Sequence, residues 1–178
     1  MIDFRFIEAL EGNVCKAYVP NPETSKSGVT IGCGFDLGAR SSRELAAAFA
    51  PELCDKLLPY AGLKKQEAAN ALADYPLVLS EEEVLRINEY SKQQAITRLT
   101  TQWNNANAYV RFDELPVQCQ TAVASVAFQY GNLATRTPNF WRQVTQGDWT
   151  AAIANLRHFG DKYATRRNKE ADLLSTLS

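Results

Sequence analysis

A segment rich in glycine and proline, residues 16–40, constrains the fold of this chain more than any other feature. Two prolines stand near its start and four glycines follow within residues 28–38, so a helix cannot form there. Residues 29–31, Val-Thr-Ile, favour a strand. The segment therefore predicts a small hairpin or irregular sheet.

Most of the remaining chain carries helical signals. Asp3 can cap a first helix that ends before Gly12. Ser80 with Glu83 forms a capping box for a long helix reaching about Trp103. Further helices are expected from Ser41 or Ser42, from Pro51, and over residues 117–130, 139–146, 149–159 and 165–177. We therefore predict an α+β, mostly α, single domain over residues 1–178, with a small mixed lobe (1–40) and a larger helical lobe (41–178).

Composition excludes several classes of protein. The 178 residues are 46% hydrophobic and 22% charged, which argues against disorder, and a net charge of −1 argues against nucleic acid as the main partner. Apolar runs are too short for a membrane span, and the N-terminus lacks the features of a secretory signal. We expect synthesis in the cytoplasm and delivery by another system, and the chain could be one domain of a larger protein.

Charge is unevenly distributed along the chain. Residues 44–89 carry nine acidic and four basic side chains, whereas residues 136–178 carry seven basic and four acidic ones. A basic end could meet an anionic substrate, or both regions could be ordinary solvated faces.

The four cysteines, at positions 15, 33, 54 and 119, form no CxxC pair, and the chain has one histidine. A metal site is therefore not expected, and no organic cofactor is implied. Two interpretations of the cysteines remain open: four half-buried free thiols, or a bridge between Cys15 and Cys33.

Three residues suggest a glycosidase-like site. Glu11 ends the first helix, where the negative end of the helix dipole and partial burial disfavour a charged carboxyl, as a general acid requires. Thr30 could hold a water, and Asp36 could orient that water or stabilise positive charge on a sugar. Taken singly, each is also an ordinary helix-end, strand or turn residue. Glu23, in a polar loop, is the other candidate carboxylate.

The segment LEGNVCKAYVPNPETSKSGVTIGCGFDLG resembles the N-terminal lobe of phage-type lysozymes. The matching elements are Glu11-Gly12, Lys16-Ala17-Tyr18 and residues 30–34. Pro20 stands where the common phage pattern has an aspartate, so that carboxylate is absent. Asp36 after the glycines instead looks like the pesticin-type branch of the lysozyme-like superfamily. That resemblance implies a lysozyme-like fold and an active site of Glu11, Thr30 and Asp36.

Further residues are candidates for substrate contact. Tyr18 and Phe35 flank the predicted site and could contact sugar or pack in the core. Gln129, Tyr130 and Asn132 lie where lysozyme-like enzymes end a central helix, and Arg166 begins a segment that looks like a late helix of related endolysins. A helix C-cap and a solvated helix face are the ordinary explanations of these two matches.

The resemblance implies a peptidoglycan muramidase that cleaves the β-1,4 bond between N-acetylmuramic acid and N-acetylglucosamine in the periplasm or cell wall. An antibacterial toxin or effector domain is the expected role, and a phage endolysin is an alternative. A toxin would need a cognate immunity protein, and we expect a monomer. A non-catalytic glycan-binding module is the alternative from another class.

Overall fold

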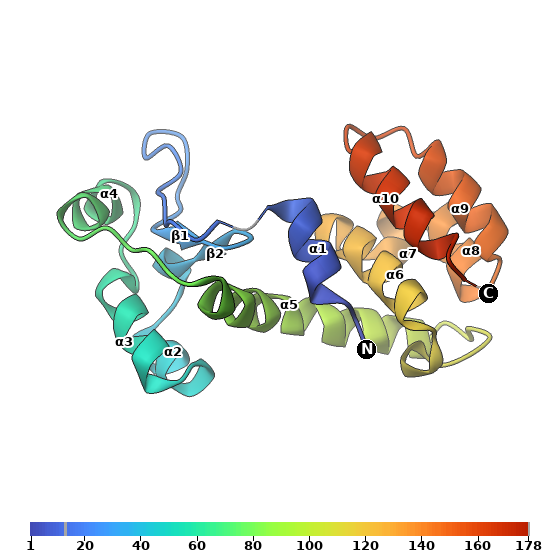
Figure 1. The fold of residues 1–178 in the computed structure, drawn as a ribbon, viewed down its shortest axis with the longest axis horizontal. Helices are drawn as coiled ribbons and strands as arrows, with labels where there is room; N and C mark the ends of the chain where they lie inside the picture. The colour runs from blue at the N-terminus through green and yellow to red at the C-terminus, as the bar shows by residue number, and fades with distance from the viewer. Residues whose placement is uncertain (13, 178) are drawn as a thin grey trace. The chain divides into compact units, whose positions relative to one another are not determined.

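The computed structural model describes residues 1–12 and 14–177, and Figure 1 traces their secondary structure. The α-helices are α1 (Phe4–Glu11), α2 (Ser42–Ala48), α3 (Pro51–Leu57), α4 (Lys65–Asp74), α5 (Glu81–Asn104), α6 (Val117–Tyr130), α7 (Leu133–Arg136), α8 (Pro138–Thr145), α9 (Trp149–Arg157) and α10 (Ala164–Leu174). The strands β1 (Thr30–Ile31) and β2 (Phe35–Asp36) pair in antiparallel orientation. Short 3-10 helices are η1 (Leu37–Ala39), η2 (Leu58–Tyr60) and η3 (Phe112–Glu114). The predicted α+β, mostly α, fold is confirmed.

The chain folds into two compact units. The sheet unit is residues 11–91, and the helical unit is residues 1–10 with residues 92–178. This division differs from the boundary expected at residue 40. Residues 41–91 pack with the hairpin because α2, α3 and the start of α5 supply apolar side chains to the same core, among them Leu45, Leu53 and Ile87.

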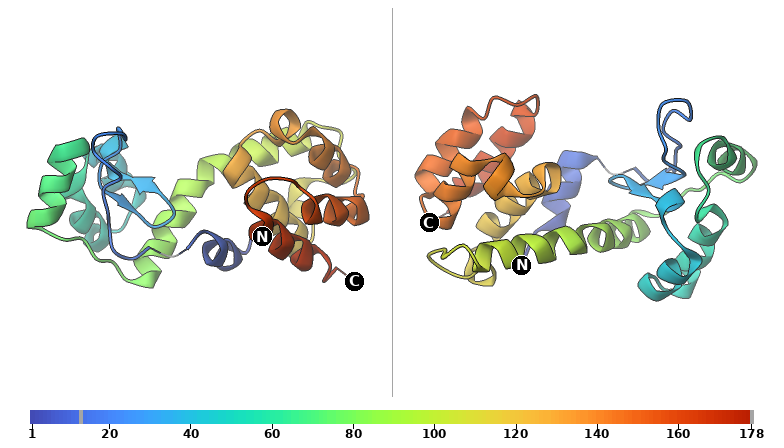
Figure 2. Two further views of the ribbon diagram at one scale, coloured as in Figure 1. Left: turned by 90° about the horizontal axis from the view of Figure 1, so that it is seen from above. Right: turned by 180° about the vertical axis from the view of Figure 1, so that it is seen from behind.

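The core of the sheet unit lies against one face of the hairpin, whose two strands are neighbouring arrows in both views of Figure 2. Successive side chains of a strand point to opposite faces, so every second residue is directed into the core. The buried set on this face is Val29, Ile31, Phe35 and Leu37. Single bridges from Tyr18 to Thr30 and from Lys16 to Val78 extend the sheet beyond β1.

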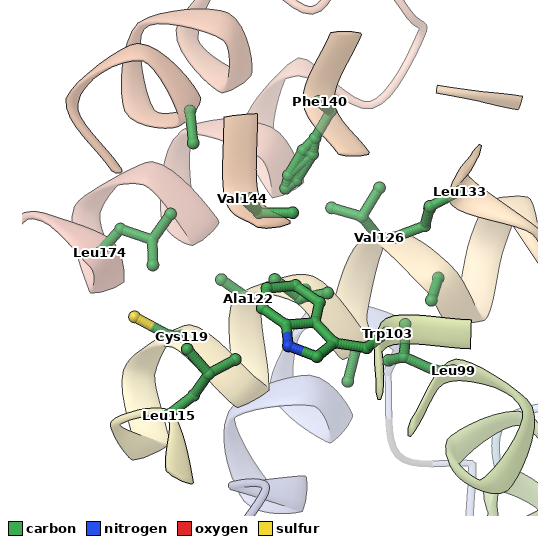
Figure 3. Close-up of a cluster of buried hydrophobic side chains, with 14 of the residues drawn as sticks. Leu99, Trp103, Leu115, Cys119, Ala122, Val126, Leu133, Phe140, Val144 and Leu174 are labelled. Carbon is green, nitrogen blue, oxygen red and sulfur yellow. The ribbon is translucent and has the colours of Figure 1, made fainter. Parts of the chain in front are cut away.

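The core of the helical unit surrounds α6. Every residue of α6 from Cys119 to Ala127 is buried. Trp103, Phe140 and Leu174 belong to the same cluster, which Figure 3 shows. Gly131 ends α6 with a φ of +74°, a conformation that glycine adopts without steric cost. A helix with such a continuous buried run is a central scaffold element.

The predicted caps are present, but two helices were not predicted. Asp3 Oδ1 accepts from the Phe6 amide at 3.1 Å, and Ser80 and Glu83 form a reciprocal capping box. The missed helices are α4 and the four-residue α7. In the part of the chain that the structure describes, no helix is long and apolar enough to span a membrane.

Candidate active site

Tyr18, Thr30 and Asp36 form a row across the sheet. Tyr18 and Thr30 exchange two backbone hydrogen bonds, of 3.0 and 2.7 Å, and Thr30 lies directly opposite Asp36 in the register of β1 and β2. Side chains opposite one another in antiparallel pairs project from the same face. The register therefore brings three of the predicted site residues to the face opposite the core, and we call them the polar row.

Phe35 lies on the other face, where sugar contact is excluded by burial. Its ring is 1% exposed and packs edge-on against Phe49 and Tyr90. The Arg40 guanidinium lies 4.5 Å from the centre of that ring. Of the two roles considered for Phe35, the structure supports core packing, because this residue precedes Asp36 and must point the opposite way.

Asp36 stabilises the turn that follows β2. Its Oδ1 accepts from the amides of Gly28 and Gly38, at 2.9 and 2.8 Å. The two glycines lie against each other and against Leu63: a Cβ atom on Gly28 would lie 2.8 Å from the Cα of Gly38 and 2.0 Å from the carbonyl oxygen of Leu63. The carboxylate is thus held in one orientation. Its other oxygen, Oδ2, accepts no hydrogen bond from the residues that the structure describes.

Thr30 is almost fully buried, at 4% exposure. Its hydroxyl donates to the carbonyl oxygen of Gly28 at 3.1 Å. Because a hydroxyl has one proton and two lone pairs, the oxygen of Thr30 can still accept from a water molecule.

Glu11 is the last residue of α1, as predicted, and its side chain is half-buried. The Gly12 carbonyl that follows accepts from Cys33 Sγ, in the turn that joins β1 to β2, at 3.8 Å. Asn88 of α5 holds the same turn, because its Oδ1 accepts from the Cys33 amide at 3.0 Å. Sequence reasoning did not identify Asn88, since this contact spans 55 residues of sequence.

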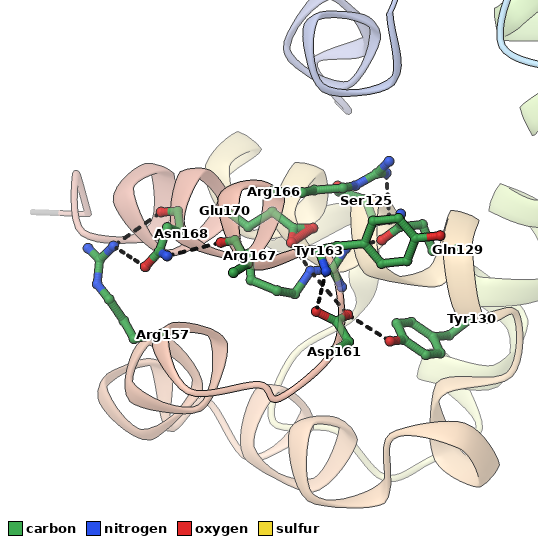
Figure 4. A network of polar contacts seen from close by, with 11 residues as sticks. Ser125, Gln129, Tyr130, Arg157, Asp161, Tyr163, Arg166, Arg167, Asn168 and Glu170 are labelled. Carbon is green, nitrogen blue, oxygen red and sulfur yellow. Dashed lines mark hydrogen bonds and ion pairs between the residues drawn. The ribbon is translucent and has the colours of Figure 1, made fainter.

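In the helical unit, three of the predicted contact residues belong to one polar network (Figure 4). Tyr130 donates to Asp161 Oδ2 at 2.7 Å, and Gln129 accepts from Arg167. Arg166 donates to the backbone oxygen of Ser125 at 2.9 Å. Burial, reinforced by the bond to Asp161, raises the pKa of Tyr130.

The network contains a buried ion pair that was not predicted. Arg167 Nε lies 2.8 Å from Glu170 Oε1, and both side chains are 0% exposed. Burial raises the pKa of Glu170 to about 7, although the charge of Arg167 opposes the shift. The interpretation of this segment as a solvated helix face is therefore wrong. The fourth predicted contact residue of this unit, Asn132, caps α7 and makes no bond to the network.

The four cysteines are free thiols, with Cys15 and Cys33 partly exposed and Cys54 and Cys119 buried. This agrees with the first of the two interpretations above, and a Cys15–Cys33 bridge is not formed. Within residues 1–12 and 14–177, no group of three His, Cys, Asp or Glu side chains could hold a metal ion.

Two comparisons with known proteins bear on this site. A family model described as "Pesticin: Bacterial toxin homologue of phage lysozyme, C-term" matches residues 1–150, well beyond the 40 residues that carried the resemblance in sequence. A search of curated proteins finds no match to the chain.

Proposed function

Because this chain belongs to the pesticin family of bacterial toxin homologues of phage lysozyme, we propose that it hydrolyses peptidoglycan as a muramidase. The bond cleaved is the β-1,4 linkage between N-acetylmuramic acid and N-acetylglucosamine. The observation that carries this proposal is the polar row, which holds a fixed, partly exposed carboxylate beside the hydroxyl of the buried Thr30, on the face of the sheet opposite the core. Catalysis needs such fixed groups, because small misplacements cost large factors in rate.

In the proposed reaction Glu11 is the general acid. Its proton moves to the glycosidic oxygen as the bond to C1 of the muramic acid breaks, and water adds to C1. Thr30 accepts from that water and orients it. Asp36 acts through Oδ2, either as the base that takes the proton of the water or as a negative charge opposite the cationic sugar. The choice depends on the separation of the two carboxyl groups.

The sugar contacts follow from the same proposal. Tyr18 is the aromatic member of the polar row and is exposed, so its ring can contact the glycan strand. Gln129, Tyr130, Asn132 and Arg166 belong to the helical unit, and their contact with sugar stays a prediction. The bond that the structure shows for Arg166 is to Ser125 of α6. No cofactor takes part.

For the biological role we propose an antibacterial toxin or effector domain that acts as a monomer on the cell wall of a target bacterium, after delivery by another system. The family description names bacterial toxin homologues, which supports this role. A cognate immunity protein in the producing cell is part of the proposal. An endolysin with the same activity is the alternative role.

One observation favours a second function, non-catalytic glycan binding. Asp36 Oδ1 is engaged by two backbone amides, an arrangement that an aspartate in a turn adopts without any catalytic duty. Pro20 stands at the position of the usual phage aspartate, and the lack of that carboxylate also favours non-catalytic binding.

Purified peptidoglycan sacculi distinguish the two functions. A muramidase clears a sacculus suspension and releases reducing ends, and borohydride reduction followed by mass spectrometry identifies those ends as muramic acid. Reduced glucosamine ends would indicate cleavage of the other glycosidic bond and would contradict the proposal. Co-sedimentation of the protein with sacculi, with no new ends, would support the binding module.

A further inference from the structure

The exposed face of the sheet continues past the polar row. Lys16 pairs with Val78 in an antiparallel bridge. Because Lys16 and Tyr18 are two residues apart on one extended segment, their side chains share a face. Ala17, between them, is buried on the core side. Lys16 and Val78 therefore form a second row beside the polar row.

The second row is accessible and carries one positive charge. Val78 is 63% exposed and Tyr18 is 43% exposed, while Lys16 is exposed at the surface. Among the residues that the structure describes, none forms an ion pair with Lys16. Lys16 is one of eight basic side chains in residues 11–91, which also contain twelve acidic ones.

We propose that Lys16, flanked by the apolar surfaces of Tyr18 and Val78, binds a carboxylate carried by the muramoyl residue of the substrate. This inference rests on the proposed muramidase function and specifies the substrate group that the site selects. A lysine ammonium suits a carboxylate whose position varies, because it is a point charge on a flexible stem.

The spacing of the sheet supports a role in binding rather than in bond cleavage. Neighbouring strands lie about 4.8 Å apart and residues rise about 3.4 Å along a strand, so the backbone of Lys16 lies roughly 12 Å from that of Asp36. A contact at that distance is formed equally in the bound substrate and in the transition state. Such uniform binding lowers KM and leaves kcat unchanged.

Two carboxylates of peptidoglycan fit this chemistry. One is the lactyl carboxylate of a muramic acid that carries no peptide, and the other belongs to the stem peptide attached there. Glycan chains stripped of peptide by an amidase offer the first, and peptide-bearing chains offer the second. A loss of affinity in the Lys16 variant on one kind of chain identifies the source.

The test compares wild type with Lys16→Met and Lys16→Arg on intact sacculi and on sacculi whose carboxylates have been converted to amides. On intact sacculi, Lys16→Met should raise the apparent KM about threefold to fivefold with an unchanged kcat, and Lys16→Arg should restore most of the affinity. On amidated sacculi, wild type and Lys16→Met should have the same KM. Lys26→Met, in the polar loop, is the matched control and should behave as wild type.

Two outcomes would overturn the inference: an unchanged KM of Lys16→Met on intact sacculi, or an equal rise on intact and amidated sacculi. Failure of the proposed function is a separate result. In that case wild type would release no reducing ends from either kind of sacculus.

Discussion

The sheet unit and the helical unit hold their polar groups in opposite ways. In the sheet unit, Asp36 is partly exposed and is oriented by amides two and eight residues away in sequence. In the helical unit, Arg167 and Glu170 are fully buried, and Arg167 also bonds Gln129, 38 residues distant. The orientation of the proposed catalytic carboxylate therefore depends on nearby backbone, whereas the polar network of the helical unit depends on side chains distant in sequence and on their protonation.

The largest expected effect concerns Glu11. Glu11→Gln removes the only proton that the mechanism supplies to the leaving group, so hydrolysis of sacculi should fall on the order of a hundredfold or more. Thermal unfolding should be unchanged, because the amide has nearly the same shape. Glu8→Gln, the same substitution on the same helix, is the control. Near wild-type activity of folded Glu11→Gln would show that another group is the acid.

The second carboxylate gives the next effect. Asn at position 36 keeps a carbonyl oxygen for the amides of Gly28 and Gly38 but loses the charge, so Asp36→Asn should fold normally and lose at least tenfold in rate. Thr30→Ala should lose as much or somewhat less, and Glu23→Gln should lose little. Reducing-end release at fixed protein concentration measures all three. An inactive Glu23→Gln beside an active Asp36→Asn would transfer the role to the loop carboxylate.

Gly28→Ala tests whether the sheet unit depends on the close approach of its backbone at this position. The added Cβ would meet the Leu63 oxygen at 2.0 Å, a backbone atom that cannot move aside easily. We expect the free energy of unfolding to fall by about 2–4 kcal/mol in urea titrations. At Gly34 no atom lies within 4 Å of the added Cβ, so Gly34→Ala should lose only the smaller strain of its φ of +97°. Equal losses in the two variants would contradict close approach at Gly28.

Protonation of Glu170 in the helical unit should make the free energy of unfolding depend on pH. The pKa of Glu170 is raised from 4.5 to about 7, so between these values the native state holds a proton that the unfolded chain has released. Stability from this group is therefore complete below about pH 4.5 and falls as the pH rises to 7. The unfolding free energy of wild type minus that of Glu170→Gln should decrease on the order of 3 kcal/mol across this range. A difference that is constant with pH would show that Glu170 is ionised throughout.

The stability that Glu83 of the sheet unit contributes should change with pH in the opposite direction. Its bond to Lys56 lowers its pKa, so the stability it contributes is lost as the pH falls. Measurements of unfolding free energy against pH can therefore distinguish the contribution of Glu170 from that of Glu83.

The smallest expected effect is a difference in thiol reactivity between the two units, with no change in stability. Partly exposed Cys15 and Cys33 of the sheet unit should react with iodoacetamide in the native protein, whereas Cys119 of the helical unit should react only after unfolding, because burial raises the pKa of its thiol to about 12. Peptide mass spectrometry gives the order of labelling. Protection of Cys15 and Cys33 that disappears on reduction would indicate a disulfide.

Local signals explain which parts of the fold could be predicted. The caps at Asp3 and Ser80 each depend on residues within one turn of helix, so the sequence indicates them directly. Helix α4 was missed because Lys64 provides no side-chain cap and Lys65 begins the helix with a φ of +50°. The unit boundary was missed because it depends on how residues 41–91 pack against the hairpin.

The candidate site was predictable in its members and not in its geometry. Glu11, Thr30 and Asp36 stand in a short motif, but their roles are still predictions. That Tyr18 shares a face with Thr30 follows from a pairing twelve residues apart in the sequence, and strands of two residues carry too little alternation to assign Phe35 to the core. Arg167 and Glu170 stand in the segment that looks like a late endolysin helix, but their burial as a pair could not be predicted, because charged residues are usually at the surface.

The alternation of the hairpin also links folding accuracy to activity. A shift of one residue in the pairing of β1 with β2 would turn one strand over relative to the other. Either Ile31 would leave the core and Thr30 would turn into it, or Phe35 would leave the core and Asp36 would turn into it. The misfolded form would be both inactive and prone to aggregate through its exposed apolar side chains. The hydrogen bonds that Asp36 accepts from the amides of Gly28 and Gly38 therefore stabilise the correct register. Selection for an active protein is at the same time selection against the aggregating form.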